Sequence, residues 1–484
     1  MQKMSLPNKM AQHSLLRIHR AMVFVCLASL PALANGQIRD SLSFEAFREL
    51  VIQNHPLAQR ANLNVEKGEN AKRIARGAFD PKLQAGINNK VFDGLTYYDM
   101  RNLQLEVATP SPVTIKAGYD QVSGSYYNPE LKTPEDGLVT AGISLPILRG
   151  LVTDERRTAL RQANAFNEYS LLEQENMINQ LLLDAYMQYW NWWNAFQKKQ
   201  VAQSVVDLII PRLNATRELA LQGDLPIIDT LETFTQYQNR LLIFQEASAL
   251  EVKERMMLSS FLWSKQGDDN VAIIITNKIV PTQYQLVKPF DSYETSFLNL
   301  RDSVEFKNPE LMQYEWKFET LRAEERWKKE RIKPTLNVNY NLLSSNDNPI
   351  EAGIISNNTY KWGLTFGMPL FLRKEIGELK MTQIKIKETD FEYQVKRQDY
   401  KNKATALYEN ILIFRSQLSL AQNNRNNYSQ LLEAEKEEFL VGESSVFLVN
   451  QREQQFAEAM NKVIDLQTKI FLLEAELNYV LGTI

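Results

Sequence analysis

The sequence predicts a mixed fold of β-strands, either in a membrane β-barrel or in a protein soluble outside the cytoplasm, joined to long α-helices of a coiled-coil barrel. Its unit, present twice, is a helix, two strands and a long helical hairpin. Three observations predict this fold. The same landmarks recur in order in both halves, short segments between them alternate apolar and polar residues, and glycine-poor stretches of more than 70 residues follow. Alternation with period two indicates strands, whereas uninterrupted stretches of this length favour long helices.

Residues 1–34 have the three parts of a secretory signal peptide. Four Lys and Arg residues supply positive charge, an apolar run continues to Leu33, and the Ala-Leu-Ala sequence ending at Ala34 fits a cleavage site. The run is too short to span a bilayer as a helix, which needs about 20 residues. We therefore expect cleavage near Ala34. A lipid anchor at Cys26 is the weaker alternative, because the bulky Val25 precedes it.

The composition excludes several classes of chemistry. The 55 Lys and Arg residues nearly balance the 58 Asp and Glu residues, so no basic surface for nucleic acid is expected. Beyond the predicted leader the chain has no Cys, and its only His is His55. Disulfides, thiolate metal sites and Cys nucleophiles are thereby excluded, and no phosphate-binding loop motif occurs. We expect a protein that is not an enzyme, without catalytic residues, cofactor or metal.

The duplication is visible in repeated prolines and glycines. Pro56 is followed 25 residues later by Pro81, and Pro309 is followed 25 residues later by Pro334. Further landmarks common to both halves are a proline-containing turn and a hairpin-tip glycine, namely Pro146 with Pro369 and Gly223 with Gly442. Four landmarks in one order are hard to obtain by chance.

These landmarks define the expected domain boundaries. The first repeat spans 35–263, with strands at about 82–145 and a helical hairpin at about 150–263 whose tip is near 223. A linker at 264–295 is expected to form an equatorial belt. The second repeat spans 296–484, with strands at about 334–368 and a hairpin at about 372–482 whose tip is near 442. Each repeat should open with one helix, at about 43–76 and 296–331.

Two strands in each half give four per chain, and a four-stranded sheet has two open edges. No open edge is stable in hydrocarbon, and bacterial barrels start at about eight strands. If the strands lie in a membrane, the chain must therefore assemble with copies of itself. Residues 91–138 are an insertion relative to the second repeat, and the alternation at 113–119 suggests an extended hairpin there.

The helical stretches should be about 100 Å long at 1.5 Å per residue. Pro211 is expected to interrupt and bend the first of them. The last helix carries two apolar seams, one of them interrupted by Glu453, Gln467 and Glu474. Two seams predict helical neighbours on both sides, as in a ring of coiled coils, and a solvated two-helix rod is the alternative.

Two further features have structural interpretations. His55 precedes Pro56 where the second repeat has Asn308 before Pro309, which favours a helix-capping role over catalysis. The aromatic residues between 186 and 196 favour interhelical packing at a surrounding belt over a ligand platform.

With these motifs the chain resembles the TolC-type outer-membrane efflux protein family over about 42–484. The resemblance rests on the Asn-His-Pro and Asn-Pro helix starts, the Phe-Asp-Pro strand entry at 79–81, the turn at 145–150 and the glycine-containing tips. It implies a homotrimer in the cell outer membrane, with a 12-stranded barrel in the lipid and a helical tunnel in the periplasm. It also implies that a periplasmic adaptor and an inner-membrane transporter dock at the helical tips.

The resemblance assigns roles to residues at both tips. The docking residues would be Gly223 and Asp224 in the first tip and Val441, Gly442 and Glu443 in the second, and only the second tip keeps the family's Val-Gly pair.

The family's best-known members have an acidic entrance constriction in the second hairpin, at two positions that Leu448 and Gln451 occupy here. The equivalent first-hairpin positions are Asp229 and Glu232, which would supply an alternative acidic ring around the entrance. A second interpretation is that both are solvated acids favoured by the helix dipole.

The resemblance therefore predicts a passive channel for small molecules or secreted products. The alternatives are the outer-membrane component of a protein secretion system and an exported coiled-coil structural or adhesive protein. A carboxylate-based hydrolase is a more remote alternative.

Overall fold

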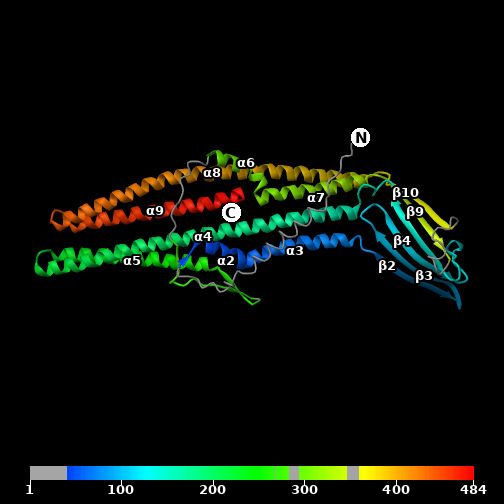
Figure 1. Cartoon of the computed structure of the whole chain (residues 1–484), viewed down its shortest axis with the longest axis horizontal. Coiled ribbons are helices and arrows are strands. Elements are labelled where there is room, and N and C mark those ends of the chain that lie inside the picture. The colour runs from blue at the N-terminus through cyan, green and yellow to red at the C-terminus, as the bar shows by residue number, and fades with distance from the viewer. Residues whose placement is uncertain (1–40, 268, 283–293, 346–358) are drawn as a thin grey trace, which may run out of the picture.

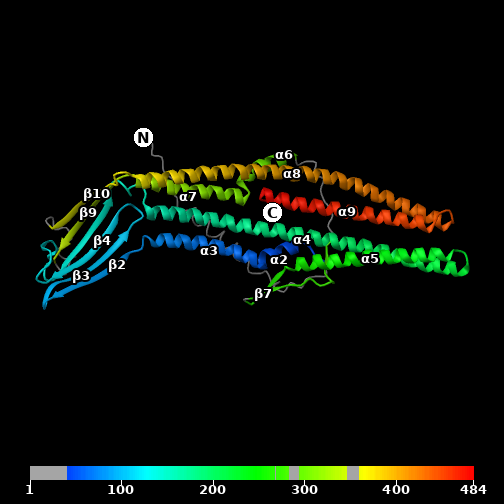
Figure 2. The same cartoon turned by 180° about the vertical axis from the view of Figure 1, so that it is seen from behind.

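The computed structural model describes residues 41–267, 269–282, 294–345 and 359–484. The chain is elongated, with a β-sheet at one end and two long helical hairpins running toward the other (Figure 1). The view from behind shows that both hairpin turns lie at the end opposite the sheet (Figure 2). The predicted leader and Cys26 lie outside the described residues.

The opening helix of each repeat is divided in two. The four helices are α2 (Phe44–Asn54) and α3 (Pro56–Gly77) in the first repeat, and α6 (Glu294–Asp302) and α7 (Pro309–Arg331) in the second. The expectation of one continuous helix at 43–76 and at 296–331 is wrong. A proline lacks the N–H group that would bond to the preceding turn, so it disfavours a helix interior but fits well at the first helical position.

The residue before each of these prolines caps the helix that follows. Nδ1 of His55 accepts a hydrogen bond from the backbone N–H of Leu57 at 3.1 Å, and Oδ1 of Asn308 accepts one from Glu310 at 3.0 Å. The capping role predicted for His55 is confirmed.

The main sheet has six strands, all antiparallel to their neighbours, in the order β10-β9-β5-β4-β3-β2. Its strands are β2 (Lys82–Phe92), β3 (Leu95–Ala108), β4 (Thr114–Ser123), β5 (Leu138–Pro146), β9 (Thr335–Ser344) and β10 (Tyr360–Gly367). The two repeats join where β5 pairs with β9.

The expectation of four strands per chain is wrong, because the insertion at 91–138 contributes the whole of β3 and β4. The strand suggested at 113–119 is β4. Asp99 and Arg101 stand at apolar-face positions of β3 and conceal its alternation. In the structure, β3 is held by backbone hydrogen bonds to β2 on one side and β4 on the other. A local sequence pattern does not reveal such pairing.

The long hairpins are formed by α4 (Glu155–Gln222) with α5 (Ile227–Ser259) and by α8 (Arg373–Leu440) with α9 (Val446–Leu481). Both α4 and α8 have 68 residues, or about 100 Å of helix. The interruption expected at Pro211 is not found, because α4 continues through it. A proline removes one helical hydrogen bond, and the buried Ile209 and Leu213 on either side keep this segment packed.

The helices pack in a defined lateral order. Near the sheet this order is α3, α4, α7 and α8, and toward the tips α4 packs against both α5 and α9 while α9 also packs against α8. Each hairpin therefore has a helical neighbour outside itself, so the two-helix rod is excluded and the two seams of the last helix are explained.

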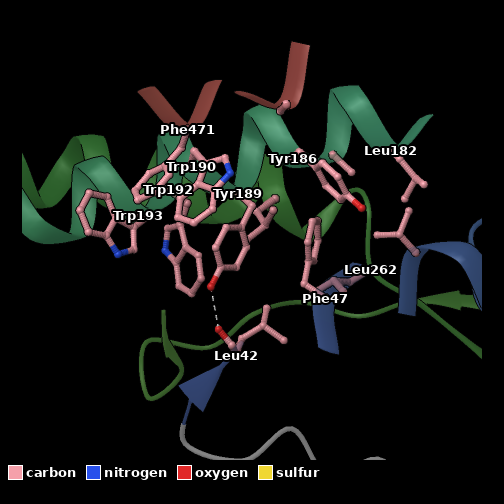
Figure 3. Close-up of a cluster of buried hydrophobic side chains, with 14 of the residues drawn as sticks. Leu42, Phe47, Leu182, Tyr186, Tyr189, Trp190, Trp192, Trp193, Leu262 and Phe471 are labelled. Carbon is pink, nitrogen blue, oxygen red and sulfur yellow. Dashed lines mark hydrogen bonds between the residues drawn. The ribbon is translucent and has the colours of Figure 1, made fainter. Parts of the chain in front are cut away.

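The largest hydrophobic core of the described residues lies about halfway along the molecule, where α2 packs against α4 (Figure 1). This region is called the waist. Trp190 and Trp192 of α4 are buried there with Phe47 of α2, and the rings of Trp190 and Phe471 stack with centroids 4.0 Å apart (Figure 3). The hydroxyl of Tyr189 donates to the carbonyl of Leu42 at 2.9 Å. The aromatic cluster is therefore packing, as predicted.

Short strands lie beside this core. β1 (Ser41–Leu42) pairs with β8 (Val280–Pro281), and β6 (Trp263–Gln266) forms a hairpin with β7 (Asp269–Ala272). Part of the linker expected at 264–295 thus packs against this core through Ile273 and Ile275, and residues 283–293 lie outside the described residues.

Candidate functional sites on the sheet and at the helical tips

One face of the six-stranded sheet carries apolar side chains on every strand, with Asp99 and Arg101 of β3 as its charged exceptions. The alternation of each strand, combined with the pairing register, aligns Ile143 of β5 with Tyr340 of β9 and Trp362 of β10. The residues of this apolar face include Leu83, Ile87, Leu103, Leu105, Ile115, Tyr119, Val139, Ile143, Val338, Tyr340, Trp362 and Leu364. Many are widely exposed, such as Ile87 at 76% and Trp362 at 65%. An exposed apolar surface of this extent indicates contact with lipid or with another chain.

The opposite face of the same sheet is polar. The side chains on it include Gln84, Asn88, Asn102, Gln104, Thr140, Ser144, Asn337, Asn339, Asn341 and Thr365. A sheet that is apolar on one face and polar on the other suits a boundary between lipid and water.

Both hairpin tips turn at a glycine in the left-handed region. The φ angles of Gly223 and Gly442 are 84° and 82°, and a Cβ at either position would meet open space. Glycine is thus required at the tips by backbone conformation, not by crowding. Asp224, Val441 and Glu443 are exposed beside them, as docking residues would have to be.

The tips also expose large apolar side chains that were not singled out in the sequence. Leu221 and Ile227 of the first tip are each 82% exposed, and Leu440 of the second is 83% exposed. The sequence does contain a signal for these exposed side chains, namely an apolar residue close to a predicted turn glycine. Turns exposed to water usually carry polar residues instead.

The proposed constriction residues lie one or two turns from the tips. Asp229 is in the first turn of α5 and is partly buried, as is Glu232, whereas Leu448 and Gln451 of α9 are exposed. Within the described part of the chain, neither carboxylate forms an ion pair. The position of Asp229 also suits a favourable interaction with the helix dipole.

A buried charged cluster, comprising Arg212, Arg240, Asn450 and Glu453, links the two hairpins nearby. Glu453 of α9 is only 2% exposed. Nη1 of Arg240 in α5 lies 2.7 Å from Oε2 of Glu453, and Arg212 of α4 pairs with both carboxylate oxygens. Nη1 of Arg212 also donates to Oδ1 of Asn450 at 2.6 Å. Three helices thus meet at one carboxylate.

The electrostatics of this cluster favour the ionised carboxylate. Burial alone would raise the pKa of Glu453, but hydrogen bonds and positive charge from Arg212 and Arg240 outweigh it and hold the pKa below its ordinary value of 4.5. Burial lowers the pKa of Arg240, against the opposing effect of Glu453, although a guanidinium stays protonated in proteins. One sign of this cluster is visible in the sequence, because the carboxylate of Glu453 interrupts an apolar seam of the last helix.

A second polar link closes the tip of the second hairpin. Oγ of Ser444 and Nε of Arg452 donate to the two carboxylate oxygens of Glu435, the latter at 3.2 Å. These hydrogen bonds, that of Ser444 foremost, lower the pKa of Glu435 against the effect of burial. The link joins the end of α8 to the start of α9 across the turn.

Two features are absent from the described residues. Among the helices there, none combines the length and apolar character needed to cross a membrane. The described His, Asp and Glu side chains form no group of three or more that could hold a metal ion.

Comparison with known proteins gives the class of the fold. Residues 300–483 match the family model of outer membrane efflux proteins. The chain is similar to the CmeC outer membrane channel of Campylobacter jejuni, with 13% identity and a TM-score of 0.63 over 91% of this chain and 85% of that one. It is also similar to the outer membrane protein VceC of Vibrio cholerae, with 11% identity and a TM-score of 0.60 over 90% of this chain and 95% of the other. No curated protein matches the chain.

A further similar structure is the open state of the MtrE outer membrane channel of Neisseria gonorrhoeae, with 12% identity and a TM-score of 0.59 over 90% of this chain and 88% of that one. The family resemblance seen in the sequence is thus confirmed. The second repeat matches the outer membrane efflux protein family, and the described chain has the TolC-like fold of such channels, in which long helical hairpins extend from a set of strands.

Proposed function

We propose that this chain forms the outer-membrane channel of a tripartite efflux system, through which small molecules or secreted products leave passively. The observation that carries the proposal is the six-stranded sheet, apolar on one face and polar on the other, at the end of helices about 100 Å long. Lipid would cover the apolar face, and the helices would extend into the periplasm.

The channel requires more than one copy of the chain. A single six-stranded sheet leaves two edges unpaired, and hydrocarbon offers nothing to satisfy their N–H and C=O groups. Assembly as a homotrimer, the state implied by the family, would close the sheet and enclose a water-filled space lined by its polar face.

The helical tips would receive a periplasmic adaptor and, through it, an inner-membrane transporter that supplies the energy. The exposed apolar side chains of Leu221, Ile227, Leu440 and Val441 support this role, because such side chains at the far end of a helical hairpin are suited to burial against a partner.

The entrance would be narrowest near these tips. Three copies of Asp229 and Glu232 would place carboxylates around the opening and favour cations there. Leu448 and Gln451 would add an uncharged layer from the second hairpin.

The test is isolation of the wild-type protein from outer membranes. A heat-modifiable trimer that conducts ions across planar bilayers is the expected result. Recovery as a monomer in the periplasmic fraction, without conductance, would contradict the proposed function.

A further inference from the structure

The sheet is wider than the duplicated unit requires. Each repeat needs one strand leading away from its first helix and one returning to its hairpin, and among the described residues of the second repeat these are β9 and β10 alone. In the first repeat β3 and β4 are added between β2 and β5. The edges of the described sheet are therefore β2 and β10. The repeats join where β5 pairs with β9, so β2 lies three strands beyond β5 and β10 lies one strand beyond β9.

Both edge strands carry the apolar face to the limit of the sheet. Leu83 and Ile87 of β2 are 69% and 76% exposed, and Phe366 of β10 is 65% exposed. Neither edge strand contains an internal proline that would prevent further pairing. In lipid, each edge needs a partner strand along its full length.

We propose that β10 of one copy pairs with β2 of the next, so that three copies close an 18-stranded sheet rather than the 12-stranded one that the family resemblance implies. This inference rests on the proposed trimeric channel. It assigns the extra strand pair to the wall of the channel, where it widens the outer end.

Strand direction supports this pairing. β2 leaves the end of α3 and runs away from the helices, whereas β10 runs back toward the start of α8. Pairing between copies would thus be antiparallel, like all five pairs within the described sheet. A closed sheet can be antiparallel throughout only if its number of strands is even. Adding two strands per copy keeps that number even.

The width of the sheet also matches the helices beneath it. Six strands about 4.8 Å apart and tilted by about 40° cover about 38 Å of circumference. Four helices packed about 10 Å apart, as α3, α4, α7 and α8 are ordered here, cover about 40 Å. Four strands would cover only about 25 Å. The six-stranded sheet therefore continues the helical tunnel without narrowing.

The polar face would line the wider end with amides, glycines and charges of both signs, among them Lys116, Asp120 and Lys361. Asn337, Asn339 and Asn341 of β9 share the polar face with Gly142 and Gly363. An 18-stranded cylinder would be about 36 Å across at its backbone, and closed sheets of this size leave an aqueous channel. Selection of solutes by size would then fall to the narrower helical tips.

Cysteine cross-linking tests the pairing. Cys26 is the only native cysteine, so Cys26→Ser gives a cysteine-free full chain. Into it, Gln84→Cys or Asn88→Cys in β2 is combined with Lys361→Cys, Gly363→Cys or Thr365→Cys in β10. All five positions face the polar side, and the six pairs sample the registers. Oxidation in the membrane should convert at least one pair into covalent dimers and trimers that a reductant reverses.

Two further pairs of cysteine substitutions serve as controls. Ile87→Cys with Gly363→Cys places the thiols on opposite faces and should give no cross-link. Lys116→Cys in β4 with Gly363→Cys asks whether β4 is the edge that meets the next copy. Cross-linking through β4 would overturn the proposal, because each copy would then contribute four strands to the ring.

The failure of this inference differs from the failure of the proposed function. An intact trimer that cross-links through none of the six pairs contradicts the 18-stranded sheet alone, whereas absence of any trimer contradicts the channel itself. An electron-microscopy structure of the unmodified particle gives the number of strands directly and does not depend on the cysteine variants. Eighteen strands are expected, and twelve would overturn the inference.

Discussion

Nη1 of Arg240 lies 2.7 Å from Oε2 of Glu453, which fixes α5 of the first hairpin to α9 of the second although the two residues are 213 positions apart. Arg212 approaches the same carboxylate from α4. The two halves of the chain are thus held together near their free ends by charge, whereas at the waist they are held by aromatic packing.

Replacement of this carboxylate should destabilise the tips. Glu453→Gln leaves Arg212 and Arg240 buried without a counter-charge, and breaking a buried pair in this way costs about 3–5 kcal/mol. Chemical unfolding followed by helical circular dichroism measures the loss. Glu458→Gln is the matched control, since Glu458 is exposed on the same helix, and it should change stability by less than about 0.5 kcal/mol. Equal effects of the two substitutions would contradict a special role for Glu453.

The same cluster predicts a dependence on pH. The pKa of Glu453 is lower in the folded chain than its ordinary value of 4.5. A lowered folded pKa contributes stability above the unfolded pKa, and this contribution is lost as the pH falls through the folded value. The stability difference between wild type and Glu453→Gln should therefore be constant near neutrality and shrink below about pH 4.5. Unfolding curves collected from pH 7 to pH 3 measure it, and a difference that grows in acid would refute the assignment.

The two faces of the sheet should tolerate charge differently. Leu364 and Thr365 are neighbours in β10 and point to opposite faces. Leu364→Arg puts a charge on the apolar face, which costs about 2–4 kcal/mol near the bilayer midplane, and should reduce the yield of outer-membrane trimer. Thr365→Arg should assemble normally and shift the ion selectivity of the channel toward anions. Comparable yields for both variants would mean that the apolar face does not meet lipid.

The acidic entrance can be separated from simple helix-dipole stabilisation. Asp229→Asn with Glu232→Gln should weaken the block of channel conductance by divalent cations, because three copies of each carboxylate would otherwise attract them. Planar-bilayer recordings with added Mg²⁺ measure the block. The matched control is Glu437→Gln with Glu438→Gln, which removes two exposed acids near the other tip. Unchanged block in the first variant would leave only the helix-dipole interpretation.

Local sequence patterns were sufficient to predict much of the secondary structure of this molecule. Prolines at matching intervals marked the duplication, and alternation with period two identified β2, β5, β9 and β10 because one face of each strand is apolar. His55 and Asn308 were recognisable as caps from their position before proline. The tip glycines were evident because a left-handed turn between two helices favours glycine.

Other features depended on partners far along the chain. Glu453 looked like an interruption of an apolar seam, and only folding brings Arg212 and Arg240 to it from the other repeat. The continuity of α4 through Pro211 likewise depends on neighbouring helices, which a local pattern does not represent.

The sequence by itself determined the doubled architecture, the helical hairpins and their tips, since these follow from short-range periodicity and backbone preference. Tertiary structure decided that the sheet has six strands, because β3 takes its place from hydrogen-bonded ladders on both sides rather than from its own polar-interrupted pattern. It also decided how the hairpins are joined, because a buried ion pair exists only when residues from both halves meet away from water.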